Sequence, residues 1–121
     1  MRPGTSVLLR FVERLGTWRV NFVIYRNRRA FRRAVGVSSH CTGAYVPAGH
    51  PKATRSLGTL HLPVSADPGT VAHEAMHAIF DWMKVRRFTP SQALDNEERS
   101  ADYLAALVRR HYYELGKAAG L

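Results

Sequence analysis

The feature that most constrains the fold is one apolar-rich helix, predicted from Asp67 to about Arg87. Asp67 is a typical N-cap residue, and Pro68 suits the first position of a helix. Basic residues near the end suit the negative end of the helix dipole. Apolar residues surround the helix on several sides, so we expect it to lie centrally in the domain: Val71, Ala72, Ala75, Met76, Ile79 and Phe80.

This helix carries two histidines four residues apart, His73 and His77, and Glu74 directly follows the first. Side chains at positions i and i+4 of a helix lie one above the other, so both imidazoles can bind one metal ion. Glu74 points about 100° round the helix from His73, where it can take a proton from a metal-bound water. This HExxH spacing predicts a zinc site with Glu74 as general base. The alternative is that both histidines are ordinary helix residues.

A third zinc ligand is expected, because catalytic zinc sites usually have three protein ligands and one position for water. Asp81 is eight residues from the first histidine, about 12 Å along a straight helix, so it cannot complete the site. Glu98 is the candidate that we prefer, because Asp102 follows one turn later and can accept the second N–H of a ligand histidine. Glu97 is the rival, and both glutamates can also simply serve a helix N-terminus.

The rest of the chain predicts a small α+β domain with one core, since 121 residues with 45% hydrophobic content suit a single compact domain. Period-two alternation predicts strands at 17–26 and 57–64, with a shorter strand in 43–48. Helical spacing predicts helices at 5–16 and about 96–115, the second with a capping-box-like start at Asp95 and Glu98. Residues 27–36 are expected to form a short basic helix or turn that ends at Gly36. The apolar stripe of the last helix is predicted at Ala101, Leu104, Ala105, Val108, Tyr112 and Leu115.

With these motifs in place, residues 57–108 resemble the gluzincins, the zinc peptidases that include thermolysin, and in particular small phage-encoded proteins of this type. The resemblance lies in the sequences "TLHLP", "TVAHEAMHA" and "NEERSADYLAAL". It implies a minimal zincin-like domain, in which a small, mainly antiparallel sheet packs on the HExxH helix and on a C-terminal ligand-bearing helix.

The resemblance also implies roles for individual residues. It implies zinc on His73, His77 and Glu98, with Glu74 as general base and acid and Asp102 behind a ligand histidine. The spacing between histidine and glutamate in thermolysin corresponds to Glu97 in this chain. Both Glu97 and Glu98 therefore remain candidates for the third zinc ligand.

Substrate binding is expected at strand 57–64, because the equivalent strand of zincins is a sheet edge that pairs with an extended peptide. A peptidase also needs a hydrogen-bond donor for the oxyanion. His61 on this strand is the candidate, and Tyr45 and His50 are others, although each can equally be a surface polar residue.

The net charge of +9 is concentrated in the first forty residues, which hold nine arginines and one acidic residue. The densest block predicts a site for nucleic acid or an acidic partner, or simply a solvated face. It contains Arg26, Arg28, Arg29, Arg32 and Arg33.

The single cysteine, Cys41, excludes an internal disulfide and suits a reducing compartment. No apolar segment is long enough to span a bilayer. We therefore expect a protein that is not secreted and does not bind membranes, and that is cytoplasmic, or virion-associated if phage-encoded.

Two functions compete for the single domain 1–121, which combines a basic helix and strand half at 1–56 with an edge strand and metal-site helices at 57–121. The first is a zinc-dependent peptidase. The alternative is a metal-stabilised, non-catalytic phage or virion-associated protein, which binds nucleic acid or a protein partner through its basic half. Glu74 favours the peptidase, because a purely structural metal site does not need it. A domain without metal is the third possibility.

Overall fold

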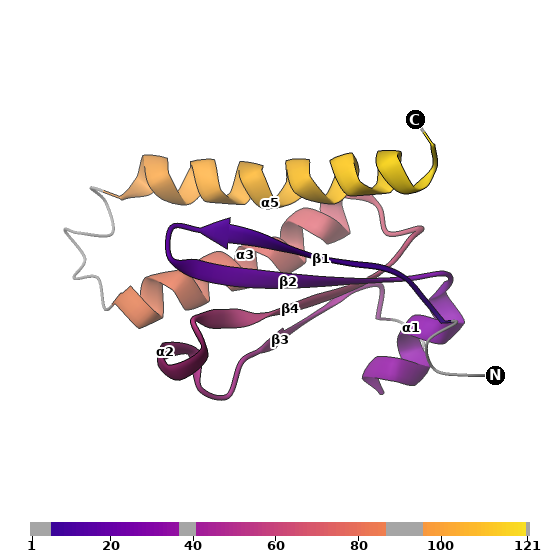
Figure 1. The fold of residues 1–121 in the computed structure, drawn as a ribbon, viewed down its shortest axis with the longest axis horizontal. Helices are drawn as coiled ribbons and strands as arrows, with labels where there is room; N and C mark the ends of the chain where they lie inside the picture. The colour runs from indigo at the N-terminus through magenta and orange to yellow at the C-terminus, as the bar shows by residue number, and fades with distance from the viewer. Residues whose placement is uncertain (1–5, 37–40, 87–95, 121) are drawn as a thin grey trace.

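The computed structural model describes residues 6–36, 41–86 and 96–120, in which a four-stranded sheet packs with four helices (Figure 1). The α+β class predicted from the sequence is confirmed. The elements follow in the order β1 (Val7–Leu15), β2 (Trp18–Tyr25), α1 (Arg28–Val35), β3 (Ala44–Pro47), α2 (Pro51–Thr54), β4 (Ser56–Pro63), α3 (Pro68–Arg86) and α5 (Glu97–Ala118).

The sheet has the strand order β1-β2-β4-β3. β1 and β3 pair antiparallel with their neighbours, whereas β2 and β4 run parallel, so the sheet is mainly antiparallel as expected. The prediction that strand 57–64 forms an edge is wrong, because β4 is hydrogen-bonded on both sides, to β2 and β3. The edge strand next to it is β3.

The prediction of a helix at 5–16 is wrong as well. β1 and β2 form a hairpin in which Leu15 pairs with Trp18, and Gly16 turns the chain with a φ of 66°. Tight hairpin turns require a positive φ, which glycine adopts without strain. Exposure alternates along β1, since Phe11 and Leu15 are buried while Arg10, Val12 and Arg14 are exposed.

α3 and α5 cover one face of the sheet and enclose the main core with it (Figure 1). The rings of Phe11 and Phe22 stack in this core with centroids 4.5 Å apart. Trp82 of α3 contacts Tyr103 of α5, with ring centroids 5.0 Å apart. The buried strand residues of this core include Val20, Phe22, Ile24, Leu60 and Leu62.

The other face of the sheet carries a smaller core, where Phe31 of α1 packs on Val23 and Tyr25. Asn27 caps the start of α1 by accepting a hydrogen bond from the Ala30 N–H, and Gly36 ends it with a positive φ. Of the short helix or turn predicted at 27–36, the structure therefore shows the helix.

α5 lies where the last helix was predicted, but its buried side differs. Ser100, Leu107 and His111 are buried, whereas Ala101 and Ala105, predicted for the apolar stripe, are exposed. The N-cap residue is Asn96, which makes no capping hydrogen bond through its side chain. Asp95, predicted to start this helix, lies outside the described residues.

The strands predicted at 17–26 and in 43–48 are present as β2 and β3, while the short helix α2 was not predicted. In the described part of the chain, the helices are all too short or too polar to cross a membrane.

Candidate metal site

α3 begins as the sequence predicts. The Asp67 carboxylate accepts a hydrogen bond from the Thr70 N–H at 2.8 Å, and this bond lowers the pKa of Asp67. Val71, Ala75, Ala78, Ile79 and Trp82 are buried. Their burial sets the rotation of α3, so that the side carrying both histidines faces the strand β3 instead of the core.

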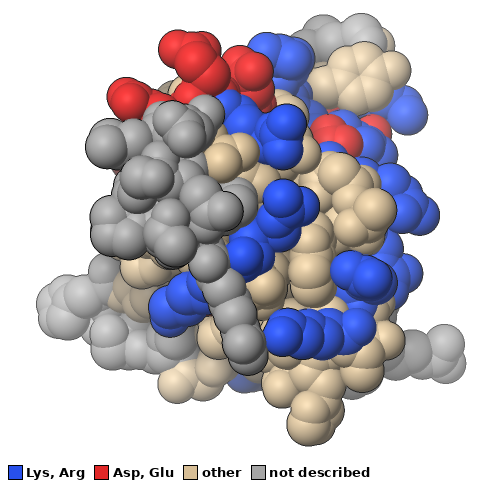
Figure 2. Space-filling view, turned by 90° about the vertical axis from the view of Figure 1, so that its left-hand side faces the viewer, with Lys and Arg blue, Asp and Glu red and all other residues tan. Residues whose placement is uncertain are grey.

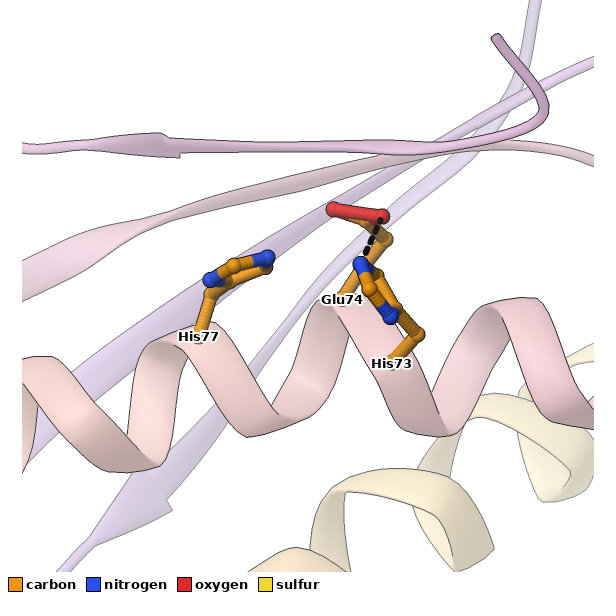
Figure 3. Close-up of side chains that lie close together, drawn as sticks. All are labelled: His73, Glu74 and His77. Atoms are coloured by element: carbon orange, nitrogen blue, oxygen red, sulfur yellow. Dashed lines mark ion pairs between the residues drawn. The ribbon is translucent and has the colours of Figure 1, made fainter.

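His73, Glu74 and His77 lie together on this side of α3. Each offers one possible ligand atom, and these atoms all lie within 4.8 Å of one another. Figure 3 shows the three side chains on the side of α3 that faces the strands, with the His73 Nε2 3.8 Å from a carboxylate oxygen of Glu74. Glu74 is 8% exposed, whereas both histidines are exposed. Two imidazoles and a carboxylate are a donor set that could hold a divalent metal ion.

Tyr45 of β3 packs against this group. Its ring is nearly parallel to that of His77, with centroids 6.4 Å apart. Its hydroxyl lies 2.8 Å from a carboxylate oxygen of Asp81 and 2.9 Å from the carbonyl oxygen of Leu57. Burial raises the pKa of Tyr45, and the hydrogen bond to Asp81 raises it further. The hydroxyl proton is therefore engaged within the protein, which does not fit the oxyanion role considered for Tyr45.

Glu74 lines two hollows that open on either side of it. The hollow beside His73 has a volume of about 500 Å³ and small or polar walls, including Cys41, Thr42 and Thr70. The hollow beside His77 has a volume of about 610 Å³, and Phe80, which lines it, is 50% exposed. Both volumes are within the range of small-ligand sites.

Two glycines let the strands approach this group closely. A Cβ on Gly43 would lie 2.8 Å from the Thr70 methyl group and 3.2 Å from the Glu74 Cγ. A Cβ on Gly58 would lie 2.6 Å from the Tyr45 hydroxyl. Sequence reasoning considered Tyr45 as an oxyanion donor but missed its contacts with His77 and Asp81. It also missed Gly43 and Gly58, because the close approaches at these glycines depend on how distant segments pack together.

Glu98, its rival Glu97 and Asp102 are not brought to the histidines. α3 and α5 run antiparallel, and the ring contact between Trp82 and Tyr103 sets their register. His77 precedes Trp82 by five residues, and Glu98 precedes Tyr103 by five. Because the two helices run in opposite directions, these offsets point away from each other and add up. Glu98 is therefore separated from His77 by about 15 Å along the helix axes.

The three acidic residues are exposed, and Figure 3 shows α5 on the side of α3 opposite the histidines. The expected ligand role of Glu98 or Glu97, and the second-shell role of Asp102, do not match this placement. The reason is the direction in which the histidines face, which follows from the burial of the other side of α3.

His61 is placed on the opposite face of the sheet from the histidine pair. It pairs with Ala44 and Val23, and its Nδ1 lies 2.8 Å from the Tyr25 hydroxyl. Burial lowers the pKa of His61, and Arg10 lowers it further. The oxyanion role considered for His61 does not fit this position. His50, the other histidine considered, is exposed at the start of α2.

Comparisons with models of protein families, with curated proteins and with solved structures found no match.

Proposed function

We propose that this chain is a metal-dependent hydrolase that cleaves amide bonds in peptides, with Zn²⁺ bound by His73 and His77. One observation supports the proposal above all. The ligand atoms of His73, Glu74 and His77 lie within 4.8 Å of one another, and the carboxylate between two open hollows is almost fully buried.

The donor set fits zinc. Imidazole nitrogens and carboxylate oxygens are its usual protein ligands, together with thiolates. When bound, the ion would polarise the scissile carbonyl and lower the pKa of water. Glu97 and Glu98 are left out of the ligand set, and Glu74 is within reach of the ion as a further donor when no substrate is present. Because two histidines alone hold zinc less tightly than three protein ligands, we expect a metal that exchanges readily.

Glu74 is the residue that moves the proton. Its carboxylate lies at the junction of the two hollows, directly beside His73. From there it accepts a proton from the attacking water and returns it to the leaving amine, the usual work of a general base and acid. Because Glu74 is mostly shielded from solvent, bulk water competes little for this proton.

The substrate strand pairs with β3 in this proposal, and no longer with β4. Among the described strands, β3 is hydrogen-bonded only to β4, so its outer side can accept an extended peptide. A peptide along β3 passes both hollows beside Glu74. The hollow with Phe80 and Tyr45 suits an apolar side chain, whereas the hollow with Thr42 and Thr70 suits a small or polar one.

The experiment combines metal content with peptide hydrolysis. Zinc bound per chain and cleavage of a mixed peptide library are measured for the parent protein and three variants. Glu74→Gln should keep zinc and lose hydrolysis by a factor of about 10² to 10⁴, the usual contribution of a general base. His77→Ala should lose zinc as well as hydrolysis. Glu98→Ala is the matched control and should change neither.

Two results would contradict the proposal. If Glu74→Gln hydrolysed peptides at the parental rate, Glu74 could not be the residue that carries the proton. If Glu98→Ala lost zinc while His77→Ala kept it, the metal would be bound by residues of α5 and not by the histidine pair of α3.

A further inference from the structure

The face of the sheet opposite α3 and α5 is basic. Arg10 and Arg14 of β1 lie on it, and the strand pairing places Arg14 beside Arg19 of β2. Glu13, the only acidic residue before Asp67, points to the other face, where it forms an ion pair with Arg110 of α5 at 3.5 Å. The four strands and α1 therefore place no carboxylate on this face.

α1 extends the basic surface at one end of the sheet. Arg28, Arg29 and Arg33 are exposed on this helix, which has no acidic residue in its first turn. These are arginines of the block that the sequence singled out. Figure 2 views the molecule from the end opposite α1, where acidic side chains gather at the top, near the start of α5, and several Lys and Arg side chains lie below them among uncharged residues.

A hollow of about 450 Å³ opens on this face between β1, β2 and β4. Arg10, Asn21, Thr59 and His61 give it polar walls, and Val12 adds an apolar side chain that is 40% exposed. The Nδ1 of His61 lies 2.8 Å from the Tyr25 hydroxyl, and the ring is partly exposed. The hollow thus offers one guanidinium group, hydrogen-bonding groups and one imidazole ring to a ligand.

We propose that this face of the sheet, defined by Arg10, Arg14, Asn21, Thr59 and His61, binds single-stranded nucleic acid. Arginines without neighbouring carboxylates attract a polyanion, and each phosphate contact releases counterions. A flat sheet face with a hollow accepts an unpaired base, which stacks on imidazole rings or guanidinium planes. A duplex is instead read by an element that enters a groove, such as a helix or a free two-stranded ribbon, whereas the strands of this face are joined in one four-stranded sheet. The inference is independent of the metal site.

Binding is measured by fluorescence anisotropy with labelled single strands of about 12 nucleotides, the size range of single-strand sites. A hairpin duplex of the same composition and polyglutamate serve as competitors. The variant carries Arg10→Gln and Arg14→Gln together. Its matched control carries Arg99→Gln and Arg109→Gln, which remove the same charge from exposed positions on α5.

The test variant should bind single strands at least about tenfold more weakly. The slope of log K against log salt should fall by about 1.4, since each single-strand phosphate contact contributes about 0.7. The control should change affinity by less than about twofold, because its arginines lie away from the phosphate path. His61→Ala should weaken binding with an unchanged salt slope, because it removes a base contact and no charge. Far-UV circular dichroism checks that each variant is folded.

Three results would overturn the inference. Equal losses in the test and control variants would mean that only net charge matters. Tighter binding of the duplex would exclude a single-strand site, and displacement of the oligonucleotide by polyglutamate at equal charge concentration would assign the face to an acidic protein. Glu74→Gln should bind single strands like the parent protein, which separates this inference from the proposed hydrolase.

Discussion

The two faces of the sheet differ in what covers them. Two long helices pack on one face, where Phe22, Ile24 and Leu60 are buried. On the other face, α1 is the described helix that packs on the sheet, at one end, and Val12 and Val46 are 40% and 46% exposed. The same strands thus supply the core with one set of side chains and offer the alternate set to solvent. An apolar side chain on these strands therefore indicates the core only when the residues two positions before and after it, which lie on the same face, are buried as well.

The charges of the two faces differ in the same way. Glu13 and Glu114 surround Arg110 on the side of α5, whereas the arginines of the open face have no carboxylate from the strands beside them. The candidate metal site belongs to the covered side, but it lies at the rim, where α3 faces the edge strand β3. Three separate regions around one sheet are therefore involved. The covered face holds the main core, the rim beside β3 holds the proposed hydrolytic site, and the open face is the proposed nucleic-acid site.

The largest expected effect is a difference in unfolding free energy between substitutions on the two faces. Phe22→Ala removes a buried ring that stacks on Phe11 at 4.5 Å, and it should lower the free energy of unfolding by about 3–5 kcal/mol. Val12→Ala, on the open face, should cost less than about 1 kcal/mol. Urea unfolding followed by tryptophan fluorescence measures both. Similar losses in the two variants would mean that the open face is covered in solution.

A buried histidine on the covered side predicts a pH effect on stability. His111 is 0% exposed, neither ring nitrogen has a hydrogen-bond partner among the described residues, and desolvation lowers its pKa from 6.5 to about 4. Between these two pH values the unfolded chain binds the proton and the folded chain does not. The free energy of unfolding should therefore fall as the pH drops from 6.5 to 4, by about 3 kcal/mol from this residue, and level off below pH 4.

The His111→Met variant tests this contribution, because it fills the site with a group that does not titrate. Its unfolding free energy should vary less with pH between 6.5 and 4 than that of the parent protein. His61→Gln is the comparison on the open face. Burial lowers the pKa of His61 as well, but this ring is partly exposed and hydrogen-bonded to Tyr25, so the slope should change less. An unchanged slope in His111→Met would show that His111 is hydrated or paired in solution.

Much of the fold could be predicted because its signals are local. The alternation in β2 and β4 and the capping residue Asp67 each lie within a few residues of the structure that they specify. β1 was mistaken for a helix because its apolar residues also fit helical spacing and because Gly16 suits a helix end as well as a hairpin turn. Only the pairing with β2, a contact between strands, decides between these two interpretations.

The candidate site also has one part that could be predicted from local sequence and one part that could not. His73, Glu74 and His77 could be placed together from spacing alone, because one helix carries all three. The position of Glu98 depends on which side of α3 faces α5 and on the register of the two helices. Buried polar residues of α5, Ser100 and His111, do not follow the apolar stripe, and they concealed which side of that helix is buried.

The smallest effect concerns two neighbouring residues of β4 that face opposite sides. Gly58→Ala would place a Cβ 2.5 Å from the Val46 carbonyl oxygen and 2.6 Å from the Tyr45 hydroxyl. Because the first of these atoms belongs to the backbone, β3 must shift away from β4, and we expect a loss of about 1–3 kcal/mol in unfolding free energy. Faster amide hydrogen exchange in β3 should accompany the loss.

Thr59→Ala, on the open face, is the matched change at the next residue. It leaves β3 in place and should cost no more than about 1 kcal/mol, the span of strand preferences. Since Tyr45 packs on His77, Gly58→Ala should also weaken zinc binding, whereas Thr59→Ala should not. If both variants kept the parental zinc affinity while only Gly58→Ala lost stability, the contact between Tyr45 and His77 would serve the fold and not the metal, and the edge strand would be independent of the proposed site.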